Sequence, residues 1–106
     1  MRTVFQECLD NLLVAEDELQ FLDPDRLTPE EIVARGRSLD AISDCVDRLI
    51  QRRLATLTDE QAANLESLRT ATARLTEDLH RMQSMTQTIN IVSSALDTIV
   101  SLVRLI

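Results

Sequence analysis

The sequence contains no lysine, tryptophan or tyrosine, and it has only one glycine and two prolines. Without lysine, the chain has no side chain for a Schiff base or an amine nucleophile. Two phenylalanines are its only aromatic residues, and the aromatic and β-branched runs typical of strands are missing. Residues that favour helices, such as Leu, Ala, Arg, Glu and Gln, dominate instead. We therefore expect an all-α fold, with a single helical domain over residues 1–106.

Chemical motifs are also scarce. The sequence has no glycine-rich phosphate loop, no Cys-x-x-Cys pair and no EF-hand loop. The formal net charge of -7 argues against nucleic acid as a partner, because phosphate binding requires clustered cations. We therefore expect neither an enzyme nor a cofactor.

The N-terminal stretch carries acidic residues within its apolar run, which is not the pattern of a secretory signal peptide. In such a chain, Cys8 and Cys45 are expected to stay reduced and to act as small core residues. These features together predict a cytoplasmic protein.

Apolar residues spaced three and four apart predict a first helix over residues 3–22 and a second over residues 29–57. Thr28 and Glu31 form a capping box that starts the second helix, with Pro29 at its first position. Gly36 either marks a close helix approach or a break, and we favour a continuous helix. The residues that this helix is expected to bury are Ile32, Leu39, Ile42, Val46, Leu49, Ile50, Leu54 and Leu57.

A third helix is expected over residues 59–105, started by a second capping box at Thr58 and Gln61. The link to the preceding helix would then be one or two residues long, which predicts an antiparallel hairpin with Ile50 facing Leu65 and Ile42 facing Leu75. One heptad seam runs through the whole segment: Leu65, Leu68, Thr72, Leu75, Leu79, Met82, Thr86, Ile89, Ser93, Leu96, Val100 and Val103.

The predicted third helix is longer than the second, about 72 Å against about 43 Å at 1.5 Å per residue. The overhanging end is the most apolar part of the chain, and it suggests an interface with a second copy or with a helix of a partner protein. The predicted interface residues are Ile89, Val92, Leu96, Ile99, Val100, Leu102, Val103 and Ile106.

Two other arrangements would also bury this end. A break near Ser84–Thr88 would let the chain fold back into a four-helix bundle, whereas the unbroken heptad phase favours one long helix and self-association. Insertion into a membrane is disfavoured, because Asp97 and Arg104 interrupt a short apolar stretch.

Two side-chain groups have the spacing of metal ligands. Glu77 and His80 match the carboxylate and imidazole spacing of di-iron bundles, but they fall outside the heptad seam and we expect a solvated face. Asp40, Asp44 and Asp47 line one face of the second helix at a spacing compatible with Mg²⁺, although neighbouring arginines favour exposed ion pairs instead.

The sequence therefore favours a non-enzymatic helical scaffold that self-associates through its apolar C-terminal helix as a homodimer or a larger assembly. One alternative is a small acidic chaperone or adaptor that binds an amphipathic helix of a partner protein. A second is a metal-dependent all-α hydrolase that uses Asp40, Asp44 and Asp47.

Overall fold

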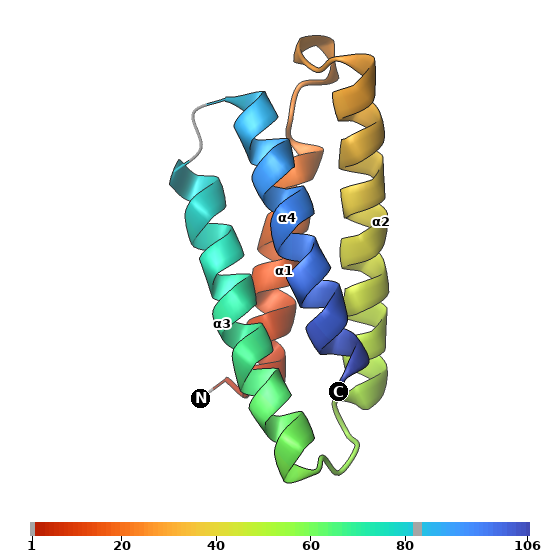
Figure 1. Cartoon of the computed structure of the whole chain (residues 1–106), viewed down its shortest axis with the longest axis vertical. Coiled ribbons are helices and arrows are strands. Elements are labelled where there is room, and N and C mark those ends of the chain that lie inside the picture. The colour runs from red at the N-terminus through yellow and green to blue at the C-terminus, as the bar shows by residue number, and fades with distance from the viewer. Residues whose placement is uncertain (1, 82–83) are drawn as a thin grey trace.

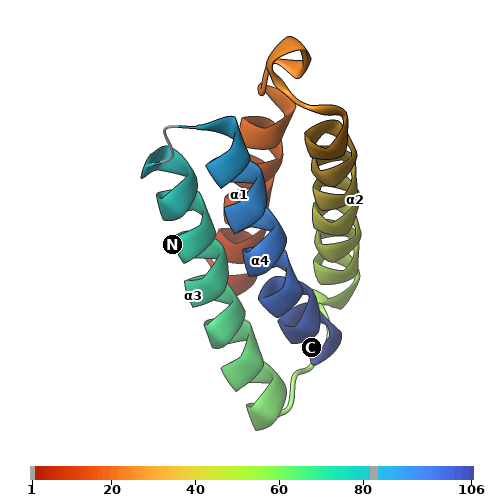
Figure 2. The ribbon, with the colours of Figure 1, turned by 45° about the horizontal axis from the view of Figure 1, so that its top comes forward.

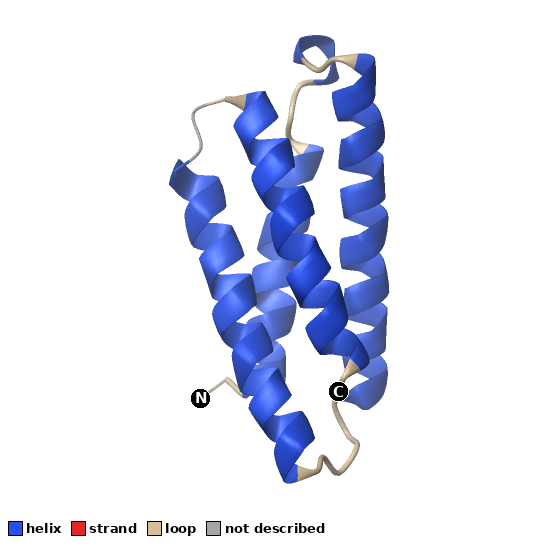
Figure 3. Ribbon diagram, in the orientation of Figure 1, coloured by secondary structure: helices blue, strands red, loops and turns tan. Residues whose placement is uncertain are grey.

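The computed structural model of this chain is a bundle of four α-helices, and it describes residues 2–81 and 84–106. The helices are α1 (Val4–Gln20), α2 (Pro29–Arg52), α3 (Asp59–Arg81) and α4 (Met85–Arg104), with a short 3-10 helix, η1 (Pro24–Arg26), between α1 and α2. The described residues contain no strand (Figure 3). The all-α prediction is confirmed, and α1 and α2 begin within one residue of their expected starts.

Side-chain caps explain where the helices begin. Thr28 Oγ1 accepts a hydrogen bond from the backbone N–H of Glu31, while the Glu31 side chain accepts one from the backbone N–H of Thr28. Thr58 and Gln61 make the same reciprocal pair at the start of α3, at 3.1 and 2.9 Å. Each pair satisfies backbone donors that a helix start leaves free. Both predicted capping boxes are therefore confirmed.

The prediction of one continuous helix over residues 59–105 is wrong. Helix α3 ends at Arg81, and α4 starts at Met85 behind Ser84, whose hydroxyl accepts a hydrogen bond from the backbone N–H of Gln87 at 3.2 Å. The chain reverses direction between the two helices, as Figure 1 shows, so the folded-back alternative is the observed one. The break lets the apolar end of the chain pack inside its own bundle. The seam position at Met82 and the side chain of Thr86 lie outside the described part.

The restart at Ser84 also changes which residues of α4 face the core. The heptad phase places Ser93 and Val100 in the core, but Ser93 is exposed and Val100 only partly buried. Val92 and Ile99 are fully buried instead. Because α4 begins at its own cap, its apolar stripe is no longer held in phase with that of α3. The buried stripe of α4 is Ile89, Val92, Leu96, Ile99, Val103 and Ile106.

Neighbouring helices around the bundle follow the order α1, α2, α4, α3, so that α1 and α4 lie diagonally opposite, as do α2 and α3 (Figures 1 and 2). Helices α1 and α3 run in one direction, and α2 and α4 run in the other. The second and third helices are therefore antiparallel, as predicted, but they are not neighbours, so the predicted hairpin in which Ile50 faces Leu65 and Ile42 faces Leu75 is wrong. Helix α2 ends at Arg52, not residue 57, and residues 53–58 cross the end of the bundle to reach the opposite corner. A diagonal crossing needs more residues than a tight hairpin does.

The core lies along the axis shared by the four helices. Its largest fully buried side chains include Leu12 and Leu19 from α1, Ile42 and Leu49 from α2, and Leu68 from α3. However, three residues expected to be buried by the second predicted helix are exposed: Ile32, Ile50 and Leu54. Ile32 and Ile50 lie near the two ends of α2, and Leu54 lies beyond its last turn, so their neighbours do not enclose them.

Candidate interaction surfaces

The eight residues predicted as an interface lie against the chain's own core. Six of them form the buried stripe of α4, and Val100 and Leu102 are partly buried beside it. They are covered because α4 packs between α2 and α3. Self-association through this face stays a prediction, and it would require α4 to leave its place in the bundle.

Large apolar side chains that remain exposed gather at the two ends of the bundle. Phe21, at the end of α1, is 86% exposed, and Ile32 and Val33 are exposed in the first turns of α2 at the same end (Figure 1). Leu54, just after α2, is 91% exposed and lies at the opposite end. Exposed apolar residues gathered at one place commonly mark sites of protein interaction.

We call the first of these surfaces the acidic end. It comprises Phe21, Asp23, Asp25, Glu30, Ile32 and Val33. The turn that forms it is fixed by hydrogen bonds: the Asp23 carboxylate accepts from the backbone N–H of Asp25 at 3.0 Å, and Arg35 donates to the carbonyl of Leu22 at 3.0 Å. The second bond ties α2 to the end of α1, so the two parts of this surface are held together.

We call the opposite surface the crossing end, because residues 53–58 cross it. It comprises Ile50, Arg52, Arg53, Leu54, Asp59, Glu60, Arg104 and Leu105, so guanidinium and carboxylate groups both lie on it. Arg52 Nε donates a hydrogen bond to the carbonyl oxygen of Ile106 at 3.0 Å, which joins the end of α2 to the end of α4. Gln61 at the start of α3 donates to the same oxygen, also at 3.0 Å. The segment after α2 is thus anchored on both sides while Leu54 projects from it.

Some charges at the two ends have no ion-pair partner. Within the described residues, no Asp or Glu carboxylate lies within ion-pair distance of Arg53 or Arg104. At the acidic end, Arg26 is the cation nearest in sequence, and it pairs only with Asp23, at 3.9 Å. Exposed charges without partners are available to a docking molecule.

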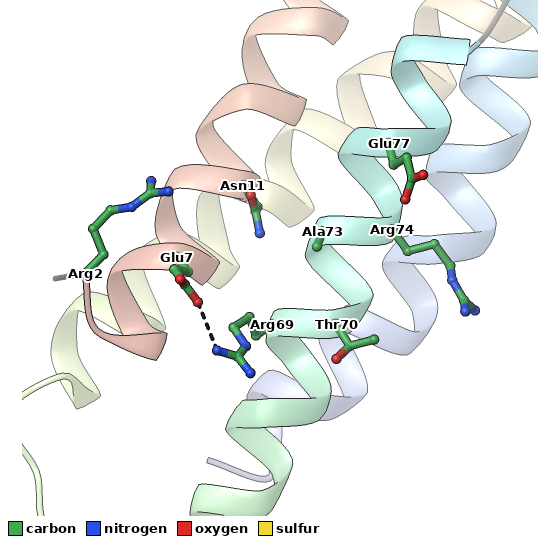
Figure 4. Close-up of a pocket in the computed structure, with 8 residues that line it drawn as sticks. All are labelled: Arg2, Glu7, Asn11, Arg69, Thr70, Ala73, Arg74 and Glu77. Atoms are coloured by element: carbon green, nitrogen blue, oxygen red, sulfur yellow. Dashed lines mark hydrogen bonds and ion pairs between the residues drawn. The ribbon is translucent and has the colours of Figure 1, made fainter.

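A hollow of about 550 Å³ lies between α1 and α3 (Figure 4). Its charges are largely compensated within the chain: Arg69 contacts Glu7 at 3.2 Å and also pairs with Glu66. Arg2, on its rim, pairs with Asp10. This hollow is an ion-paired seam that joins α1 to α3, and Arg2 and Arg69 are already engaged there. Arg74 also lines it and has no ion pair among the described residues.

A second groove of about 480 Å³ lies between α3 and α4, and its lining is mostly apolar. Ala71 and Leu75 contribute from α3, and Ile91 and Ala95 contribute from α4. Arg74 also lines it. Small side chains on both helices leave a shallow channel along the bundle.

The predicted metal-ligand groups do not assemble a site. His80 Nδ1 lies 3.4 Å from Glu18 Oε1 on α1, and Glu77 pairs with Arg81 at 2.7 Å, so the two side chains contact different partners on exposed faces. Asp44 and Asp47 share a groove with the guanidinium groups of Arg48 and Arg104, which oppose cation binding there. Among the residues that the structure describes, no group of three or more His, Cys, Asp or Glu could hold a metal ion.

Both cysteines are free and buried, as expected. Burial raises the pKa of the Cys8 thiol from 9.0 to about 11, while the neighbouring hydroxyl of Thr72 and the charge of Arg69 act in the opposite direction. The pKa of Cys45 is also raised, mainly by burial and then by the carboxylate of Asp44. Neither thiol is poised for nucleophilic chemistry, because the thiolate is the reactive form.

Comparison with protein-family models, with curated proteins and with solved structures gave no match. No described helix is both long and apolar enough to cross a membrane. The physical features of the two ends and of the α3–α4 groove are therefore the basis for a functional proposal.

The sequence pattern did not single out the two ends. Periodicity placed Ile32, Ile50 and Leu54 in the core, and it assigned no role to Phe21. Their exposure could have been predicted only from their positions in the chain. Each of these residues lies within a few residues of a helix boundary, where a helix face lacks neighbours. Periodicity identifies the apolar face of a helix, but not how far along its length that face is covered.

Proposed function

We propose that this chain is a helical interaction protein that assembles by binding other protein surfaces, including copies of itself. The observation that carries the proposal is the near-complete exposure of Phe21 and Leu54 at opposite ends of a bundle whose core is otherwise filled. Burying such a side chain is worth about 1.5–3 kcal/mol, which gives both ends a reason to bind a partner.

Light scattering on the full chain over a wide concentration range tests self-association. We expect a mass that exceeds the monomer mass and rises with concentration. A monomer mass throughout this range would contradict self-association and leave binding to a different protein as the remaining form of the proposal.

A second candidate function is an adaptor that binds an amphipathic helix of a partner protein in the α3–α4 groove. The groove favours it because Ala71 and Ala95 leave room for a helix to approach closely, as small residues do at helix contacts. Arg74, which has no ion pair among the described residues, would face an acidic residue of such a helix, and Asp78, which also lines the groove, would face a basic one.

A synthetic amphipathic peptide, with leucines on one face and flanking glutamates, tests the adaptor candidate. We expect NMR shift changes centred on Ala71 and Ala95, and we expect Ala95→Leu to weaken binding by at least tenfold by filling the channel. The matched control is Ser101→Leu on an exposed part of α4, which should bind normally. If the peptide at millimolar concentration shifts no groove resonance, this candidate is wrong.

A further inference from the structure

Few charged side chains line the groove between α3 and α4. Of the nine described residues that line it, only Arg74 and Asp78 are charged, whereas five of the eight that line the α1–α3 hollow are charged. The centres of protein interfaces are likewise depleted of charged residues. Covering this groove would therefore remove only one charge of each sign from water on each copy.

These two charged residues lie four positions apart on α3, so they lie on the same face of the helix. Neither has an ion pair among the described residues, not even with the other. An arginine that precedes its acid is also the less favourable order for a pair within one helix. Figure 4 shows the Arg74 side chain extending from α3 away from Glu7 and Asn11 of α1. Both charges are thus available to a second molecule at the groove.

We propose that two copies of this chain dimerise face to face over the α3–α4 groove, with α3 of one copy antiparallel to α3 of the other. In this contact Arg74 of each copy pairs with Asp78 of the other copy. The inference rests on the proposed self-association, and it names the surface at which the two copies meet.

A two-fold axis that crosses α3 midway between Arg74 and Asp78 produces this pairing. Such an axis reverses the direction of α3, so position 74 of one copy comes opposite position 78 of the other. Both ion pairs then form at once. A two-fold contact uses the same patch on both copies, and this patch is complementary to itself in charge.

Charge separates this arrangement from the other face-to-face dimer. If the two-fold axis ran parallel to the helices, α3 of one copy would lie over α4 of the other. The groove residues of α4, none of which is charged, are Asn90, Ile91, Ser94, Ala95 and Thr98. Arg74 and Asp78 would then be covered without partners, which is costly for a charged group. The antiparallel contact gives each of them a partner.

The apolar part of the groove suits a close contact between helices. Ala71 and Ala95 are small and half-buried, and Ile91 beside them is half-buried as well. Face to face, α3 and α4 of both copies surround one shared axis as the helices of a four-helix bundle do. These apolar side chains lie at its centre.

Two full-length variants, Arg74→Glu and Asp78→Arg, test the contact. Each variant places like charges opposite each other at both pair positions, so each alone should have a dimer dissociation constant at least about tenfold higher by sedimentation. Mixed in equal amounts, the two variants should form a 1:1 dimer. In that dimer the introduced glutamate faces the introduced arginine, and the remaining Asp78 faces the remaining Arg74.

The combined variant, with both Arg74→Glu and Asp78→Arg, exchanges the two charges and should dimerise as the unchanged chain does. Recovery by mixing or by this exchange also excludes misfolding as the cause, because a misfolded chain would not regain a partner. Melting followed by circular dichroism checks the fold of each variant. Arg53→Glu is the matched control: Arg53 is an exposed arginine without an ion pair among the described residues, and it lies at the crossing end. This control should dimerise normally.

Should a charge reversal unfold the chain, the neutral variants Arg74→Gln and Asp78→Asn test the same pair. Each should weaken the dimer, and both together should weaken it little more than either alone, because either change removes both pairs. Additive effects would show that the two residues do not contact each other across the interface.

The other outcomes overturn this inference in distinguishable ways. If both charge reversals dimerise as the unchanged chain does, self-association uses another surface. If only one of them dissociates, or if neither mixing nor the exchange restores the dimer, α3 does not lie antiparallel to α3 of the other copy. If the unchanged chain is a monomer at all concentrations, self-association itself fails together with this inference.

Discussion

The buried Cys8 thiol makes the stability of the protein depend on alkaline pH. It is fully buried between α1 and α3, where its sulfur lies 4.0 Å from the carbonyl oxygen of Leu65. Its pKa rises from 9.0 to about 11 because burial disfavours the thiolate. The chain has no lysine and no tyrosine, so few other side chains are expected to titrate in the range between pH 9 and pH 11 that concerns Cys8.

This shift predicts an alkaline loss of stability. A raised folded-state pKa means that the stabilising contribution is fully present below about pH 9 and is lost as the pH rises toward 11. We expect the contribution of Cys8 to lower the free energy of unfolding in this window by up to about 1.4 kcal/mol per pH unit. Urea titrations between pH 7 and pH 11 measure the slope.

Cys8→Ala should flatten that slope, whatever its effect on stability at neutral pH. Cys45→Ala is the companion variant, because the pKa of Cys45 is raised by burial as well. An unchanged slope in the double variant would show that the thiols are not responsible.

Of the two boundaries of helix α2, the sequence predicted the start correctly but not the end. Its capping box was predictable because both partners lie within one turn of the helix. Its end was not, because Arg52 donates to Ile106, a residue more than fifty positions away. Local hydrogen bonds set helix starts here, whereas a distant contact accompanies the end of α2.

The single glycine lies within α2 without breaking it. The helix is continuous through Gly36, as expected, and a Cβ added there would meet nothing within 4 Å. The close helix approach considered from the sequence is therefore not present at this position. Gly36 lies in open space, so no neighbour requires a glycine there.

Gly36→Ala should stabilise the protein by about 0.5–1 kcal/mol, because alanine loses less backbone entropy in a helix and meets no steric barrier at this site. Urea denaturation at neutral pH measures the change. Ser43→Gly, at an exposed position of the same helix, should have the opposite effect. If Gly36→Ala is less stable than the unchanged chain, the space around Gly36 is not open and this prediction is wrong.

A substitution at Leu96 tests whether α4 forms an interface between copies or packs in the core of its own four-helix bundle. If it formed an interface between copies, Leu96→Asp would give a folded monomer, as the long-helix hypothesis requires. In the four-helix bundle Leu96 is buried, so the charged side chain enters the core and should cost more than about 4 kcal/mol. We expect an unfolded or molten chain by circular dichroism and near-complete loss of cooperative melting.

Leu105→Asp is the control for that variant, because Leu105 is exposed at the end of α4. It should remain folded with a melting temperature close to that of the unchanged chain. A folded, cooperatively melting Leu96→Asp variant would contradict the buried position of α4.

The all-helical fold, the capped starts of α2 and α3 and the apolar stripe of α3 followed from the sequence, because these depend on residues within a turn or two of each other. The pattern of Leu65, Leu68, Thr72, Leu75 and Leu79 is buried as expected. The interruption before Ser84 was available from the sequence only as an alternative, since the heptad phase and the capping residue pointed in opposite directions.

The sequence pattern did not indicate which helices are neighbours or which apolar residues stay exposed, because both depend on how the four helices pack. The order of helices depends on a six-residue crossing and on contacts between distant segments, which periodicity does not contain. For the same reason Ile32, Ile50 and Leu54 belong to the apolar pattern of α2 and its flank yet remain exposed. A stripe is buried only where another helix lies beside it, and the lengths and placement of all four helices together set that limit.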